Sequence, residues 1–360
     1  MFHNVKHAVG PMMRTSFEIH DVDLAVVNGI RRVILTNIPV VGFLGEGHDP
    51  SFKVLQNDGP LHNEIILHRL GNIPIHMSEE ETDAFGTTTD LEEGRSDIEY
   101  TYELNVTNTS DNMLNVTTKD MQVLGRDNIP VNMKIRDRLF PANPHTKDYI
   151  LITRLRPTEK LHIKGEATKK TAAEHAGFCP VSLCSFMFIG DSINSAALGV
   201  LERERAYDKN EYGEPTKILM SIETECALSP MYLVDKALHI IISDIRKWMS
   251  SEASAIPERK NNGMEFTIED ADDTVGNIIQ SQMHNHYIRE KQSTAQNHKV
   301  TYVGYYSPHP LETRVIVKIC IEDHDNIPDT EYVDVMRDSC SRIVAYLERI
   351  KTEWNNIPSV

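Results

Sequence analysis

Residues 17–30 and 266–279 share one pattern of apolar and acidic positions. Each segment alternates apolar and polar residues as a half-buried strand does, passes two aspartates, and continues with apolar residues at helical spacing. Seven of the fourteen positions are identical, whereas composition alone would give roughly one. Because two copies are too few for a solenoid, the repeat predicts two related half-domains that pack about a pseudo-two-fold axis within one polypeptide.

Each copy predicts a strand followed by a helix. In the first copy the strand covers Arg14 to His20, and the helix runs from about Leu24 to Asn37 with Asp21 or Asp23 as its N-cap. Pro39 ends this helix because proline cannot continue one. The second copy predicts a strand from Met264 to Glu269, caps within Asp270 to Thr274 and a helix from about Val275 to His286.

Each half also contains a longer helix whose apolar residues recur every three or four positions. Ser229 and Pro230 start one helix as N-cap and first residue, and Asp329 and Thr330 are the predicted caps of the other. Such stripes are typical of helices that pack on helices, so we expect the halves to join through them; the alternative is that each stripe covers only its own sheet. The predicted interface residues are Val27, Ile30, Ile34, Leu238, Ile241, Ile245, Trp248, Val275, Ile279, Met336, Cys340, Ile343, Leu347 and Ile350.

The pattern as a whole predicts an α+β fold with two α/β halves and a β-rich insertion. Strand-like alternation recurs between the first and second helices of the first half, whereas acidic runs such as Glu79 to Glu81 and Glu202 to Glu214 indicate solvated loops. Strand candidates in the insertion are residues 97–107, 149–155, 161–164 and 186–189. The predicted units are 1–46 with 216–249 as the first half, 47–215 as the insertion, 250–263 as a linker and 264–360 as the second half.

Composition narrows the functional classes. The net charge of -16 disfavours a protein that binds nucleic acid by itself, because such affinity comes mainly from basic groups that neutralise phosphates. The five cysteines are odd in number and scattered, which favours a reducing compartment over a disulfide framework. The sequence has no run of eighteen apolar residues and starts without the regions of a secretory signal, so we expect no membrane association.

One group of residues suggests metal chemistry. His62, Glu64 and His68 have the residue types of a zinc site, and a free-standing metal-dependent hydrolase is therefore one alternative. Their spacing differs from the HExxH pattern, which places two imidazoles on one face of a helix. The sequence also has no phosphate-binding loop and no nucleophile elbow. We therefore expect no catalytic residues, no metal and no cofactor.

Three arginines are candidates for contact with a partner. Arg31 and Arg32 lie on the first predicted helix away from its apolar face, and Arg69 lies in a later segment of mixed polarity. Surface arginines are commonly only solvated. They would also suit a platform for a larger protein, because a guanidinium group makes bidentate pairs with carboxylates and backbone acceptors.

Several motifs match one known family. The first half resembles the α-like assembly subunits of cellular RNA polymerases, namely the archaeal D subunit and the third-largest subunit of RNA polymerase II. The second half resembles their small partner, the archaeal L subunit and its RNA polymerase II counterpart, and together the resemblances cover nearly the whole chain. The motifs that carry them include Asn28-Gly-Ile-Arg31-Arg32, Glu64-x-x-x-His68-Arg69-Leu70-Gly71 and the turn Pro308-His309-Pro310-Leu311-Glu312.

The resemblance implies a non-catalytic platform on which the two large catalytic subunits of a DNA-directed RNA polymerase assemble. The face with Asn28, Arg31 and Arg32 would dock the second-largest subunit, with the segment from His68 to Gly71 beside it. The catalytic magnesium would lie on the largest subunit, and DNA and RNA would be reached only through the complex. A small subunit associated with the platform is a further expected partner, and no homo-oligomer is expected.

Fusion of the two partners in one chain resembles the arrangement in large cytoplasmic DNA viruses, African swine fever virus among them, which implies viral transcription in the host cytoplasm and the virion. Gly29 stands where the family usually has alanine or serine, and Asn63 where it favours an acid. The cysteine ligands of zinc or iron–sulfur sites in some relatives are absent, so we expect no metal in the insertion. The alternatives are the hydrolase and an interaction scaffold unrelated to transcription.

Overall fold

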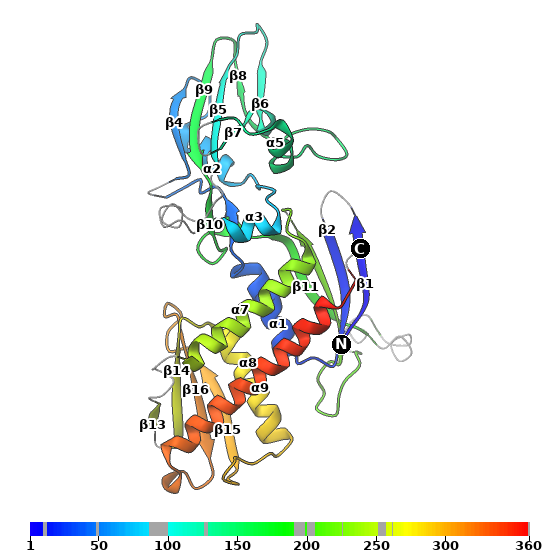
Figure 1. Ribbon diagram of the computed structural model, residues 1–360, viewed down its shortest axis with the longest axis vertical. Coiled ribbons are helices and arrows are strands. Elements are labelled where there is room, and N and C mark those ends of the chain that lie inside the picture. Colours follow the sequence, from blue (N-terminus) through cyan, green and yellow to red (C-terminus); the bar gives the residue numbers. More distant parts are fainter. Residues whose placement is uncertain are drawn as a thin grey trace.

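A group of helices crosses the centre of the molecule, with a sheet on either side and a β-rich part extending from one end (Figure 1). None of the helices within the described ranges combines the length and the apolarity needed to cross a bilayer. The computed structural model describes residues 1–9, 13–47, 50–85, 100–125, 129–190, 199, 206–224, 226–250, 257–260 and 262–358.

The first half is a four-stranded sheet with two helices. Its elements are β1 (Phe2–Val9), β2 (Met13–His20), α1 (Leu24–Thr36), β11 (Val181–Phe188), β12 (Lys217–Thr224) and α7 (Pro230–Ser250). The strand order is β1-β2-β12-β11, and all neighbouring strands are antiparallel. The helix α1 follows β2, and α7 follows β12.

The second half repeats this arrangement. Its elements are β13 (Glu258–Lys260), β14 (Gly263–Glu269), α8 (Asp273–Met283), the π-helix η4 (His284–Arg289), β15 (Val300–Tyr306), β16 (Arg314–Ile321), the 3₁₀-helix η5 (His324–Asn326) and α9 (Asp329–Asn355). The strand order β13-β14-β16-β15 is that of the first sheet once each strand is replaced by its counterpart. The sequence repeat therefore reflects a repeated topology. The strand β13 lies within residues 250–263, which we predicted to be a linker.

The insertion has its own sheets and its own hydrophobic core, which includes residues from Val41 to Ile163. Its strands are arranged as β4-β9-β5-β7, β6-β8 and β10-β3. The elements are β3 (Val40–Gly42), β4 (Phe52–Asn57), α2 (Asn63–Gly71), α3 (Glu79–Ala84), β5 (Thr101–Thr107), β6 (Leu114–Thr117), η1 (Thr118–Asp120), β7 (Gln122–Leu124), α5 (Met133–Leu139), β8 (Leu151–Leu155), β9 (Lys160–Glu166), β10 (Thr168–Lys170) and η2 (Ala176–Phe178).

The strand β11 shows where the predicted insertion, residues 47–215, differs from the structure. The predicted strand at 186–189 is part of β11, and β11 pairs with β12 in the sheet of the first half. Val181 and Cys184 on β11 are buried in the core that the two halves share. The alternation along this strand marked it as a strand but did not reveal its partner, because pairing across a long connection leaves no local signal.

The two copies of the repeat start their helices in the same way. Asp21 and Asp270 both have positive φ angles, 56° and 54°. Two residues later, Asp23 and Asp272 are the N-caps, each accepting a hydrogen bond from the backbone N–H two positions on. The predicted caps of α9 were wrong, because α9 begins at Asp329 itself and its N-cap position is Pro328. The helix of the second copy also continues beyond its predicted end at His286, as the π-helix η4.

The helices of the two halves contact each other. In Figure 1, α7 and α9 lie side by side, and α1 packs against both α7 and α8. All fourteen residues predicted for the interface are buried in one core to which both halves contribute. Full burial of each Leu or Ile contributes about 1.5–3 kcal/mol, so this core is the main source of stability for both halves.

The acidic segment at Glu79 was predicted to be a solvated loop, but it forms the short helix α3. Ser78 and Glu81 make a capping box, each side chain accepting a hydrogen bond from the backbone N–H of the other residue. The carboxylate of Glu79 accepts hydrogen bonds from the backbone and the hydroxyl of Ser229, the residue before α7. This helix therefore fastens the insertion to the first half.

The ion pair of Glu81 with Arg138 is expected to make the stability of the chain depend on pH. Both its carboxylate oxygens accept hydrogen bonds from Arg138, at 2.5 and 2.6 Å, and these bonds are the main cause that lowers the pKa of Glu81 from 4.5 to about 2. Such a carboxyl stabilises the fold above its ordinary pKa, and the contribution is lost as the pH falls from about 4.5 towards 2. In this window we expect the melting temperature of the wild type to fall more steeply than that of Glu81→Gln.

Thermal melts followed by circular dichroism at a series of pH values test this expectation. Glu64→Gln is the matched control, because Glu64 is an exposed carboxylate on the neighbouring helix α2. Equal pH slopes for Glu81→Gln and the wild type would show that the pair with Arg138 does not stabilise the fold.

Candidate functional site

Asn28 and Arg31 form a polar pair on α1. They are one helical turn apart and half-buried, and the Asn28 side-chain oxygen accepts hydrogen bonds from Nε and one terminal nitrogen of Arg31, at 3.1 and 3.0 Å. The remaining N–H groups of Arg31 have no hydrogen-bond partner among the described residues. The asparagine thus fixes the guanidinium in place while leaving donors for a further acceptor.

Arg32 lies at the contact between the halves, with 40% of its side chain exposed. Its Nε donates to the hydroxyl of Thr274 at 2.9 Å, and a terminal nitrogen lies 3.4 Å from a carboxylate oxygen of Asp272. Arg32 was predicted for the docking face together with Asn28 and Arg31, and the structure adds that it also bonds to the second half. The periodicity of α1 placed Arg32 off the apolar face correctly, but it could not show that α8 also covers this side.

The same contact occurs a second time with the halves exchanged. Ser281 is the repeat counterpart of Arg32, and Asp23 is the counterpart of Asp272; the Ser281 hydroxyl donates to Asp23 at 2.7 Å. Residue-for-residue reciprocity of this kind is a property of isologous interfaces.

Asp23 is a central residue that we predicted only as a cap. One carboxylate oxygen accepts the capping hydrogen bond from the Ala25 N–H at 2.7 Å. The other accepts from Ser281, Gln282 and Asn285, at 2.7, 2.8 and 2.9 Å. The carboxylate of Asp23 thus caps the N-terminus of α1 and accepts hydrogen bonds from three side chains of the second half.

Gly29 lies where α1 and α8 approach most closely. A Cβ atom at this position would lie 2.8 Å from Cδ1 of Ile278 and 3.3 Å from Cγ2 of Thr274. Ile278 is the repeat counterpart of Gly29, and a residue that meets its own counterpart lies next to a two-fold axis. A residue larger than glycine at position 29 would have to displace the side chain of Ile278.

The two tryptophans make a further reciprocal pair of contacts. Trp248 at the end of α7 packs on Phe266 in the second half, with a ring-centroid distance of 6.4 Å, and Trp354 at the end of α9 packs on Phe17 in the first half at 4.6 Å. Phe17 and Phe266 are counterparts in the repeat. Each long helix therefore ends with its indole on the opposite sheet.

The segment from His68 to Gly71 divides into exposed and buried residues. His68 and Arg69 are exposed on α2, and Arg69 donates a hydrogen bond to the carbonyl of Leu151 at 3.2 Å. Leu70 is fully buried in the core of the insertion, and a Cβ atom on Gly71 would lie 2.7 Å from the backbone nitrogen of Gly45. Leu70 and Gly71 were predicted for the docking face, but they position the helix and offer no side chain to a partner.

The three residues of the hydrolase alternative do not form a metal-binding centre. His62 precedes α2 as its N-cap residue, Glu64 lies in the first turn, and His68 lies in the last turn; all three are exposed. Across the described ranges, no group of three or more His, Cys, Asp or Glu side chains is arranged to hold a metal ion.

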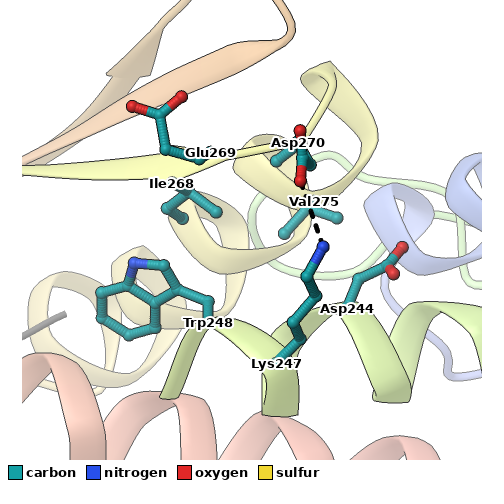
Figure 2. Close-up of a pocket in the computed structure, with 8 residues that line it drawn as sticks. Asp244, Lys247, Trp248, Ile268, Glu269, Asp270 and Val275 are labelled. Carbon is teal, nitrogen blue, oxygen red and sulfur yellow. Dashed lines mark hydrogen bonds and ion pairs between the residues drawn. The ribbon is translucent and has the colours of Figure 1, made fainter. Parts of the chain in front are cut away.

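A small cleft of about 110 Å³ lies where α7 meets the second half. Figure 2 shows Lys247 of α7 directed towards Asp270, with Nζ 3.1 Å from a carboxylate oxygen of Asp270, and Asp244 beside it on the same helix. Trp248 and Val275 form apolar walls. The described residues that line the cleft include no serine, cysteine or histidine.

The turn from Pro308 to Glu312 is exposed and held by its own hydrogen bonds. The backbone N–H of Glu312 donates to the carbonyl of His309 at 3.0 Å, and the N–H of Leu311 donates to the His309 ring nitrogen at 3.1 Å. Glu312 also pairs with Arg314 at 2.6 Å. The turn joins β15 to β16 and presents Leu311, which is 87% exposed.

Known proteins resemble both halves of the chain. Residues 16–245 match a model described as the RNA polymerase Rpb3/Rpb11 dimerisation domain, and residues 263–353 match a second model with the same description. Subunit 3 of DNA-directed RNA polymerases II, IV and V from Arabidopsis thaliana is 27% identical over 206 residues, which cover 56% of this chain and 62% of that protein. Subunit RPAC1 of DNA-directed RNA polymerases I and III from Homo sapiens is 28% identical, covering 49% of this chain and 51% of that protein.

An archaeal relative shows the same similarity. Subunit Rpo3 of the DNA-directed RNA polymerase of Methanosphaera stadtmanae is 25% identical, with 49% of this chain and 57% of that protein covered. The chain thus spans between about half and three-fifths of the length of these relatives. The match over residues 16–245 alone covers more than half of the chain. The chain therefore belongs to the RNA polymerase Rpb3/Rpb11 dimerisation domain family, and it carries two copies of that domain.

Proposed function

We propose that the chain is a non-catalytic assembly subunit of a multisubunit DNA-directed RNA polymerase, in which the two partners of the dimerisation pair are halves of one polypeptide. The reciprocal contacts carry this proposal: Arg32 with Asp272, Ser281 with Asp23, and Gly29 with its own counterpart Ile278. They support the proposal of an intramolecular pseudo-dimer held by helices. The names of the relatives, all subunits of DNA-directed RNA polymerases, support the assignment to transcription.

Polar groups of α1 in the first half and of α2 in the insertion are the proposed docking site for the second-largest polymerase subunit. Arg31, fixed by Asn28, supplies hydrogen-bond donors from α1. His68 and Arg69 supply further polar groups from α2. The segment between the end of β10 and η2 contacts the end of α1, where the Ala173 N–H donates to the Thr36 carbonyl, and the loop after β3, where His175 lies 3.1 Å from Glu46.

The cellular setting is part of the same proposal and rests on the resemblance alone. Fusion of the two partners suggests a polymerase of a large cytoplasmic DNA virus, which would place the chain in the host cytoplasm and the virion. The largest subunit would carry the catalytic magnesium, and a small platform-associated subunit would complete the assembly.

Affinity purification from the native source tests the assignment. We expect the full-length chain to recover two very large polymerase subunits in stoichiometric amounts, identified by mass spectrometry. An eluate without them would contradict the proposed function, and stoichiometric zinc that is lost in His68→Ala would favour the hydrolase instead.

Arg31→Glu tests the docking site within that experiment. Reversal of the charge should reduce recovery of the second-largest subunit at least tenfold, because a desolvated ion or hydrogen-bond pair at an interface is replaced by repulsion. The melting temperature should stay within about 2 °C of the wild type, since Asn28 is the hydrogen-bond partner of Arg31 among the described residues. Lys53→Glu, at an exposed position on β4, is the matched control. Wild-type recovery with Arg31→Glu would exclude this face.

A further inference from the structure

Two clefts lie at the junction of the halves, and counterpart residues of the repeat line them. The first cleft, about 480 Å³, has Asp21 to Leu24 on one wall and Gln282 and Asn285 on the other. The second, about 600 Å³, has Asp270 to Asp273 on one wall and Arg32 and Thr36 on the other. Asp21 corresponds to Asp270 and Thr36 to Asn285 in the repeat, so one cleft is the pseudo-symmetric image of the other.

The first cleft is bridged by the chain itself. Helix α8 continues as the π-helix η4, whose Arg289 donates hydrogen bonds to both carboxylate oxygens of Glu214, at 2.9 and 2.7 Å. The same guanidinium lies over the ring of Tyr212, 4.7 Å from its centroid. A helical turn of the second half thus contacts the connection that leads into β12 of the first half.

The second cleft lacks this bridge within the described part of the chain. Helix α1 ends at Thr36, without the extra turn that α8 has, and the Thr36 carbonyl accepts its hydrogen bond from Ala173. His20 and Glu269 are counterparts in the repeat, and they pair with Lys217 of β12 and Arg314 of β16. Lys217 and Arg314 are therefore counterparts as well. Glu214 and Leu311, each three residues earlier, correspond in the same way.

Leu311 and Glu214 therefore occupy equivalent positions with different surroundings. Glu214 is held by Arg289, whereas Leu311 is 87% exposed on a turn that its own hydrogen bonds already order. Ordering a turn costs conformational entropy, so a pre-ordered turn with an exposed apolar side chain is suited to bind without that cost. The side chain of Leu311 is therefore available to an apolar group of a partner.

The carboxylates on the walls of the second cleft indicate that a partner binding there is positively charged. Asp244 and Asp273 line it and form no ion pair among the described residues, whereas Asp270 and Asp272 already pair with Lys247 and Arg32. Burial, together with the nearby Asp272, raises the pKa of Asp244 despite the opposing charge of Lys247. A cation in the cleft would relieve this unfavourable arrangement.

We propose that the second cleft receives a helical segment of a large polymerase subunit, which occupies the position that η4 takes in the first cleft. A lysine or arginine of that segment pairs with Asp244 and Asp273, and an apolar side chain packs on Leu311. The inference rests on the proposed function, since it names the contact through which one partner is held. In the first cleft the pair of Arg289 with Glu214 already joins the two walls, so the equivalent position is available only in the second cleft.

The test uses the full-length chain co-expressed with the two large polymerase subunits of its source. Leu311→Ser should weaken binding of one of them about 10- to 100-fold, as expected from the loss of one buried leucine. Leu55→Ser is the matched control, because Leu55 is 58% exposed on β4 of the insertion. Asp244→Asn with Asp273→Asn should weaken binding and reduce its dependence on salt.

A photo-crosslinking residue at position 311 identifies the contact directly. A crosslink to a helical segment that contains lysine or arginine in a large subunit would support the inference. If the wild-type chain assembles while Leu311→Ser binds equally well and no such crosslink forms, the inference is overturned and the proposed function stands. If the wild-type chain captures neither large subunit, the proposed function fails and the inference with it.

Discussion

Ile241→Asp is expected to abolish the stable fold of the isolated chain. Ile241 is fully buried in the core that both halves build, at the centre of α7. An aspartate there must either remain charged without a partner or be protonated, and both cost several kcal/mol, in addition to about 2–5 kcal/mol for the lost aliphatic side chain. These costs are comparable to the total stability of an ordinary domain, about 5–15 kcal/mol.

His239→Asp is the control for this variant, since His239 is exposed on the same helix and receives the same new residue. Circular dichroism and thermal melts of the two variants separate burial from helix propensity. A melting temperature of Ile241→Asp equal to that of the wild type would show that this face of α7 is exposed in solution and that the halves are apart.

Exchange of Gly29 and Ile278 is expected to show coupling across the proposed axis. Gly29→Ile alone should destabilise the chain by about 1–3 kcal/mol or more, because its side chain has to enter space that Ile278 fills. Ile278→Gly alone should cost about 3–5 kcal/mol, through the cavity and the introduction of glycine into a helix. The two residues are counterparts in contact, so the double variant restores one isoleucine facing one glycine.

Urea unfolding of the four proteins measures this coupling. We expect the double variant to be more stable than the sum of the single effects by at least about 1 kcal/mol. Gly42→Ala combined with Ile278→Gly serves as the control pair, because Gly42 contacts Phe178 and lies away from the α1–α8 contact. Strict additivity for Gly29 and Ile278 would argue against their direct contact.

Much of the fold follows from local pattern. The repeat predicted both strand–helix units, and periodicity predicted the buried stripe of α7 and α9, because a helix buries residues at fixed spacing and leaves that spacing in the sequence. The helix α3 was missed because a run of glutamates has the composition of a loop. Its capping box with Ser78 and the contact of Glu79 with Ser229 stabilise it instead.

The candidate site was predicted less completely, and the reason is physical. Periodicity shows which side chains leave the apolar face of a helix, but not whether a second element covers them; Arg32, which bonds to Thr274, is the example. The strand β11 was assigned to the insertion because its partner β12 is distant in sequence. The reciprocal contact of Ser281 with Asp23 had a usable signal, because the repeat alone makes these residues the counterparts of Arg32 and Asp272.

The placement of the indoles has a practical consequence. The chain has two tryptophans, and both rest on the opposite half, with 5% and 0% of their surfaces exposed. Tryptophan fluorescence excited near 295 nm therefore comes only from the contact between the halves, because the insertion contains no tryptophan. A red shift would report separation of the halves before any change in the rest of the molecule, and no label would be required.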